Sequence, residues 1–202
     1  MKFSCIAVVF ASRAAALVAP RAPATRSVQL DAVGLYFSTM SGNTERIAGY
    51  IADAAGGLEP LSAAGVSASD LEACDAIIVG APTWNTGADD MRSGTDIDDW
   101  LYDTVAGADL SGKKVALFGC GDSAGYSGNF CDSVGELYDC FTARGATVVG
   151  FTSQEGYDHY DSKAVRDDMF VGLMCDEQNQ MDQSEDRAGA WVEQLKKEGM
   201  PL

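Results

Sequence analysis

Continuous apolar runs recur along the chain. Residues 33–37, 76–80 and 115–119 are such runs, and residues 146–151 form a further one. Runs of this length without polar alternation are typical of central strands in a parallel sheet, because helices cover both faces of such a sheet. Residues 58–61 predict a shorter strand of the same kind. The pattern therefore predicts five strands.

Helical patterns alternate with these runs. Apolar residues return at spacings of three and four over residues 47–55, and residues 134–143 and 184–197 predict two further helices. Asp182 and Glu185 have the spacing of a capping box at the start of the last helix. Strands that alternate with helices predict a doubly wound α/β fold with a five-stranded parallel sheet.

The last connection of this fold is unusually long. About thirty residues separate the run at 146–151 from the final helix, and they contain a second strand-like run at 170–173. Because compact domains seldom need so long a connection, we interpret this segment as an insertion that splits strand 5.

Residues 1–30 differ from the rest in composition. They carry four basic residues and no acidic residue: Lys2, Arg13, Arg21 and Arg26. An apolar run at 6–11 is too short to span a membrane, and an Arg-, Ala- and Pro-containing stretch follows it. This order predicts a two-part targeting segment, a signal followed by a transit-like part, that leads to a plastid. A plain secretory signal is the alternative. Residues 31–202 then form one domain.

The remaining chain is strongly acidic. Residues 31–202 contain 10 basic and 30 acidic residues, which gives a formal charge of −20. Such a surface repels nucleic acid and anionic membranes and favours a basic protein partner, although acidity that serves only solubility is an alternative. The cysteines form no CxxC pair, and His159 is the only histidine, which argues against a zinc or iron–sulfur site. We expect a monomer without membrane insertion.

A polar loop lies between the first predicted strand and the first predicted helix. Its residues are Ser38, Thr39, Met40, Ser41, Gly42, Asn43 and Thr44. A helix start presents unpaired N–H groups and attracts anions. The loop lacks the lysine of a P-loop and the glycine spacing of dinucleotide folds, so it suits one phosphate monoester. For this loop alone, an ordinary helix cap is the alternative.

Two further loops follow the next central strands. The second loop contains Pro82, Thr83, Trp84, Asn85, Thr86 and Gly87, and the third contains Cys120, Gly121, Asp122, Tyr126, Asn129, Phe130 and Cys131. Ligands of α/β sheets bind at the edge where such loops gather. A tryptophan in a polar loop suits a flat ligand stacked on it, whereas a tryptophan folded onto the core and a plain glycine-rich turn are the alternatives.

The order of TMSGNT, PTWNTG and GDSAGYSGNF resembles the flavodoxin family from about residue 33 to the end of the chain. The resemblance implies the strand order 2-1-3-4-5 and one bound flavin mononucleotide (FMN). By the same resemblance, residues 39–44 hold the phosphate, and Trp84 and Tyr126 flank the isoalloxazine ring. Backbone groups of residues 129–131 would read the pyrimidine edge of the ring, and the peptide between Asn85 and Thr86 would lie near flavin N5.

The resemblance also implies a function. The insertion, with residues 155–158, 170–173 and 176–180, looks like the long-chain subgroup of the family. A low-potential carrier of single electrons follows, with photosystem I as donor and ferredoxin–NADP reductase as acceptor, in place of ferredoxin. Such a carrier needs no catalytic residue, and none is expected here. A flavodoxin-like quinone reductase that uses NAD(P)H is the alternative.

Overall fold

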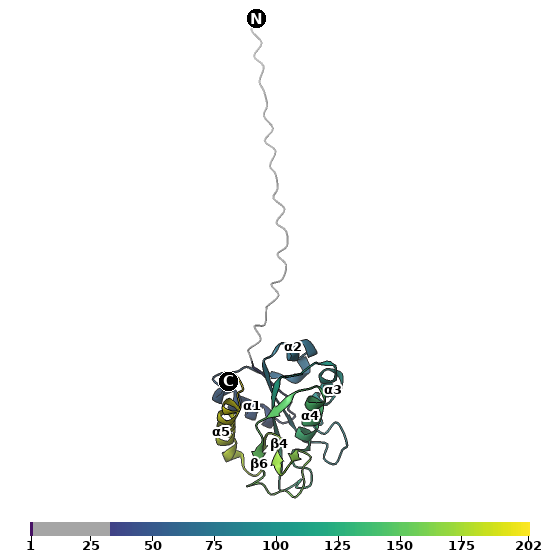
Figure 1. The fold of residues 1–202 in the computed structure, drawn as a ribbon, viewed down its shortest axis with the longest axis vertical. Coiled ribbons are helices and arrows are strands. Elements are labelled where there is room, and N and C mark those ends of the chain that lie inside the picture. The colour runs from purple at the N-terminus through teal and green to yellow at the C-terminus, as the bar shows by residue number, and fades with distance from the viewer. Residues whose placement is uncertain (2–32) are drawn as a thin grey trace.

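The computed structural model describes residue 1 and residues 33–202. The targeting segment that we expect over residues 1–30 therefore lies, apart from its first residue, outside the described residues. Residues 33–202 form one domain around a central sheet (Figure 1).

The central sheet is parallel and runs in the order β2-β1-β3-β4-β5. Its strands are β1 (Val33–Phe37), β2 (Pro60–Ser62), β3 (Ala76–Pro82), β4 (Lys114–Gly121) and β5 (Thr147–Val149). This confirms the doubly wound fold and the predicted strand order. The apolar runs form strands because both faces of β3 and β4 are buried.

The fifth strand is split, as the sequence predicts. β5 pairs with the first half of β4, and β9 (Leu173–Asp176) pairs in parallel with its second half. Between them lies a small antiparallel sheet made of β6 (Thr152–Ser153), β8 (Met169–Phe170) and β7 (Val165–Arg166). After the insertion the chain pairs with β4 again, so that β9 ends at the same edge of the sheet as β4.

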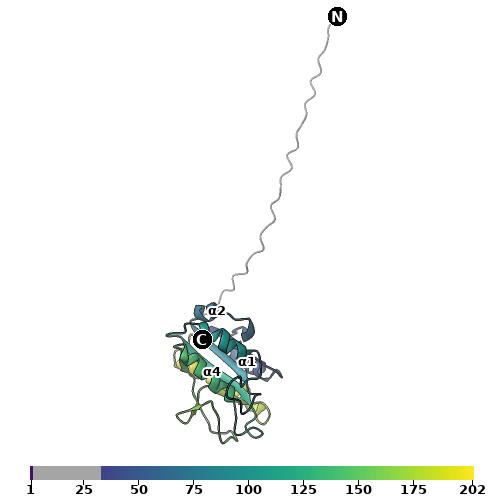
Figure 2. The same ribbon diagram turned by 90° about the vertical axis from the view of Figure 1, so that its right-hand side faces the viewer.

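Helices cover both faces of the sheet. On one face lie α1 (Asn43–Ala54) and α5 (Ser184–Lys197), and on the other lie α2 (Ala68–Ala73), α3 (Ile97–Asp103) and α4 (Asp132–Ala143). In both views α2 lies at one end of the domain and the loops of the insertion lie at the other (Figure 1, Figure 2). Two separate apolar cores result, one under each helical layer.

Some local expectations were incomplete or wrong. The short helices α2 and α3 were not predicted, because neither contains two full turns of apolar periodicity. The capping box at Asp182 and Glu185 does not form, since a 3-10 turn at Met181–Gln183 precedes α5 and no side chain caps it. The predicted end of α5 is confirmed, because Gly199 takes a left-handed φ of 82° just beyond it.

The described cysteines are all free thiols. Cys74, Cys120 and Cys175 are buried, which confirms that they act as small core residues, and Cys131 is buried as well. Across residues 33–202, no three metal-ligating side chains come together as a metal site would require. The described helices are also too short or too polar for any of them to cross a bilayer.

Candidate functional site

The loop after β1 leads into α1 through a left-handed residue. Gly42 has a φ of 87°, a value that glycine adopts without the strain that a side chain would add, and its N–H donates to Thr39 Oγ1 at 2.9 Å. Within the described residues, the N–H groups of Asn43 and Thr44 have no acceptor, because they begin the helix. Unpaired N–H groups at a helix start form a site for an anion.

The hydroxyl of Thr44 adds a further donor to this anion site. Thr44 is fully buried, and its Oγ1 finds no partner of ordinary hydrogen-bond geometry among the described residues. The nearby Cys120 thiol has a pKa raised by burial, an effect that the Thr44 hydroxyl partly opposes. A buried hydroxyl without a proper partner is costly, so this atom is suited to a ligand at the helix start.

The three loops meet around one cavity of about 150 Å³ at the carboxyl edge of the sheet. Its lining residues are Ser41, Asn43, Pro82, Thr83, Trp84, Thr86, Cys120, Gly121, Asp122, Tyr126, Asn129 and Gln178. The side chains of Trp84 and Tyr126 are large and half exposed, at 50% and 57%. Because aromatic side chains gain most when both faces are covered, these two favour a flat ligand in the cavity.

Other residues predicted for the site do not line the cavity. Ser38 is buried and bonded to Thr95 at 2.6 Å, while Met40 is exposed. Phe130 and Cys131 have fully buried side chains, so only their backbone can face a ligand, as the resemblance implies. Thr39 and Gly42 shape the first loop through their hydrogen bond, the buried Thr44 hydroxyl lies at the start of α1 outside the cavity lining, and Asn85 and Gly87 shape the second loop.

Gln178 lines the cavity, and sequence reasoning missed it as a site residue. It follows β9, whose last residue, Asp176, has no exposed surface. The Asp176 carboxylate accepts hydrogen bonds from Ser123 N (2.9 Å), Ser123 Oγ (2.6 Å), Gln178 N (3.1 Å) and Asn179 N (3.0 Å). It therefore joins the third loop to the connection that carries Gln178. The polar run at 176–180 was the feature of the sequence that could have indicated Gln178 as a site residue.

These hydrogen bonds decide the charge of Asp176. Burial alone raises the pKa of this carboxyl, but the donors from Ser123 and Asn179 outweigh burial and hold its pKa below the usual value. A carboxylate that accepts several N–H and O–H bonds stays ionised for this reason. The third loop is thus fastened by a buried negative charge.

The comparisons with known proteins agree with this geometry. The family model described as Flavodoxin matches residues 35–191. The chain is 44% identical to a flavodoxin of Picosynechococcus sp. over 81% of this chain and 95% of that protein. It is 43% identical to a flavodoxin of a Nostoc species, over 82% and 96%. The chain belongs to the flavodoxin family.

A solved structure supports the same assignment. The crystal structure of Fusobacterium nucleatum flavodoxin bound to flavin mononucleotide matches with a TM-score of 0.75 at 27% identity, covering 82% of this chain and 97% of that chain. Flavodoxins are electron-transfer flavoproteins and not enzymes, so the quinone reductase is not favoured.

Replacing Asp176 by Asn should loosen the third loop. The amide nitrogen would face the donors of Ser123 and Asn179, so we expect the free energy of unfolding at pH 7 to fall by about 2 kcal/mol or more. Because the folded-state pKa is depressed, the stabilisation is present above the unfolded pKa and is lost as the pH falls through the folded value. Urea unfolding of both proteins at pH 7 and at lower pH measures this.

Asp168 provides the control, because it lies exposed in the turn between β7 and β8. Asp168→Asn removes the same charge and should leave the unfolding free energy nearly unchanged. An equal loss in the two variants, or a loss at Asp176 that does not shrink in acid, would contradict the assignment.

Proposed function

We propose that this protein binds one FMN without a covalent bond and carries single electrons between photosystem I and ferredoxin–NADP reductase in place of ferredoxin. The observation that carries the proposal is the union of two features in one site. The buried Thr44 hydroxyl, which has no hydrogen-bond partner in the described part of the chain, lies at the helix start, and the half-exposed rings of Trp84 and Tyr126 line the adjoining cavity.

The phosphate loop would hold the FMN phosphate with neutral donors. Residues 39–44 include no cation, and the nearest basic residue on α1, Arg46, is engaged by Glu177 at 2.8 Å. Backbone N–H groups and the Thr44 hydroxyl therefore supply the contacts. Selectivity for a phosphate monoester follows from the number of donors directed at one position.

The bound flavin supplies the redox chemistry, and the chain positions it and tunes its potential. Trp84 and Tyr126 hold the ring and exclude water from its faces, and Asp122 at the cavity adds negative charge. A carboxylate about 12 Å away through water raises the energy of one added electron by roughly 0.3 kcal/mol, or about 15 mV. Several such charges together favour a low potential.

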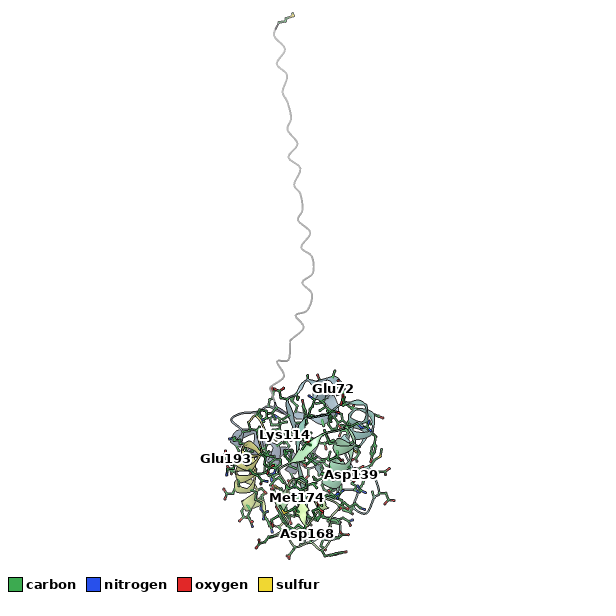
Figure 3. The ribbon with its side chains drawn as sticks, viewed as in Figure 1. Glu72, Lys114, Asp139, Asp168, Met174 and Glu193 are labelled. Atoms are coloured by element: carbon green, nitrogen blue, oxygen red, sulfur yellow. The ribbon has the colours of Figure 1, made fainter. Side chains whose placement is uncertain are left out.

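The partner would be a basic protein. Acidic residues lie in separate parts of the domain, including Glu72 on α2, Asp139 on α4 and Glu193 on α5 (Figure 3). Asp139 and Glu193 each pair with one basic residue, Arg166 and Lys196, and the net charge stays strongly negative. A charge of −20 over residues 31–202 attracts basic surfaces from a distance. The exposed rim of the ring-binding cavity then gives such a partner a short path to the flavin.

Thr44→Val should separate phosphate binding from ring binding. Valine has the shape of threonine without the hydroxyl, so we expect the dissociation constant for FMN to rise about tenfold or more, the loss of one charge-assisted hydrogen bond. Riboflavin lacks the phosphate, so its dissociation constant should stay the same. Quenching of flavin fluorescence during titration of the apoprotein measures both constants. A parallel loss of riboflavin binding would show that Thr44 does not face the phosphate.

Electron transfer to ferredoxin–NADP reductase should depend on salt. Because opposite charges steer the two proteins together, we expect the bimolecular rate constant to fall roughly tenfold or more between low and high ionic strength. Stopped-flow absorbance of the reductase flavin, mixed with the reduced protein over a series of NaCl concentrations, gives this rate constant. A rate constant that salt leaves unchanged would remove the steering argument.

We further propose that residues 1–30 direct the chain to the plastid stroma, as their basic, acid-free composition suggests. A fluorescent protein carrying residues 1–30 should accumulate in the plastid of an alga whose plastid is reached through the secretory route. A fusion to residues 31–202 serves as the control and should remain outside it. Export of the first fusion from the cell would favour a plain secretory signal.

A further inference from the structure

The second loop is held in place by a neighbouring loop, residues 88–96, which we call the brace. Trp84 N and Asn85 N both donate to Arg92 O, at 3.2 and 3.1 Å. The Asn85 amide group also donates to Met91 O at 2.8 Å. Two consecutive carbonyl groups of the brace therefore fix both the tryptophan and the residue after it.

The backbone of the brace is strained at this point. Met91 has a φ of 54°, in the left-handed region that a residue with a side chain rarely adopts. Its side chain is 41% exposed, so packing of that side chain does not account for this φ. Arg92 folds back onto the brace and donates through Nε to Ala88 O at 3.0 Å. Something outside the brace must hold Met91 in this conformation.

The carboxylate of Glu136 on α4 makes the contacts that do so. Its Oε1 accepts from Met91 N at 2.8 Å, and its Oε2 accepts from Arg92 N at 2.9 Å. Tyr102 donates its hydroxyl to Oε1, and burial together with this hydrogen bond raises the pKa of Tyr102 well above its usual value. Glu136 is 4% exposed, and no lysine or arginine pairs with it among the described side chains.

One carboxylate thus binds the N–H groups of the same two residues whose carbonyl groups bind the second loop. A buried carboxylate without a cation is costly unless every oxygen accepts strong hydrogen bonds. Here three hydrogen bonds, from Met91 N, Arg92 N and the Tyr102 hydroxyl, offset this cost. The fixed peptide groups of Met91 and Arg92 transmit the constraint to Trp84 and Asn85.

We propose that Glu136 is a positioning residue for the flavin ring: through Met91 and Arg92 it fixes Trp84 and Asn85 in the conformation that receives the ring. This inference rests on the proposed FMN function. Glu136 itself does not line the cavity. Its effect is expected on the ring side alone, because its contacts run to the brace and not to residues 39–44.

Glu136→Gln tests the proposal, with Asp139→Asn as the matched control. Glutamine has one oxygen for two N–H donors, and its own amide hydrogens would face one of them. Asp139 lies on the same helix, and its exposed side chain pairs with Arg166 and not with the brace. Asp139→Asn removes the same charge. Two quantities are measured for each variant: the hydrogen exchange of the Trp84 and Asn85 amides in the apoprotein, and the dissociation constants for FMN and riboflavin.

In Glu136→Gln we expect the Trp84 and Asn85 amides to exchange at least tenfold faster, while amides of the central strand β3 keep their rates. The dissociation constants for FMN and riboflavin should rise by the same factor, about tenfold. Asp139→Asn should change none of these values. Unchanged exchange at Trp84 and Asn85, or loss of FMN binding with riboflavin binding intact, would overturn the proposal.

A second variant covers the case in which Glu136→Gln does not fold. Tyr102→Phe removes one hydrogen bond to the same carboxylate from a side chain that is 42% exposed. We expect a smaller but measurable acceleration at the same two amides, and its absence would overturn the proposal. If the native protein binds neither flavin, the proposed function fails, whereas the exchange measurement still decides whether Glu136 holds the brace.

Discussion

Asp176 lies at the end of β9 with no exposed surface, and its charge depends on donors that come from two other segments. Without Ser123 and Asn179 its burial would cost several kcal/mol. The N–H and the hydroxyl of Ser123 donate to this carboxylate and so hold the glycine-rich third loop in place. The split of the fifth strand matters for the same reason, because β9 brings the buried Asp176 carboxylate to the edge where β4 ends.

Other carboxylates around the site also accept hydrogen bonds from neighbouring segments and so join them. Glu177 accepts from Arg46 on α1 and from the Ser184 hydroxyl at the start of α5, so it joins these two helices. Asp98 accepts from the N–H groups of Ser93 and Gly94 at 3.1 and 2.8 Å. Apart from Glu177, these carboxylates accept hydrogen bonds from neutral N–H and O–H donors, and no ion pair with a lysine or arginine forms at them among the described side chains. An anionic ligand at residues 39–44 would be held by the same chemistry.

The sequence predicts what depends on local pattern. The five strands of the central sheet, the three longer helices and the three loops follow from apolar runs and from the residues that end them, whereas the two-residue strands β6, β7 and β8 do not. Gln178 escaped prediction because its place depends on the pairing of β9 with β4, a contact between distant segments. Ser38 was placed in the site although its hydroxyl faces Thr95 in the brace. Glu136 also escaped prediction, because apolar periodicity does not show why a charged residue lies on the buried face of α4.

Two groups of atoms near the cavity lie in conformations that favour a ligand. At the helix start the N–H of Asn43 and the hydroxyl of Thr44 find no acceptor within residues 33–202, and Trp84, which lines the cavity, is 50% exposed. Flexible loops would relieve both costs by folding inward. At the second loop, in our proposal, Glu136 opposes this, because it accepts from the N–H groups of Met91 and Arg92, whose carbonyl groups hold Trp84 and Asn85. FMN binding would pair the donors at the helix start and cover Trp84. Because the site is already ordered, little conformational entropy would be lost on binding.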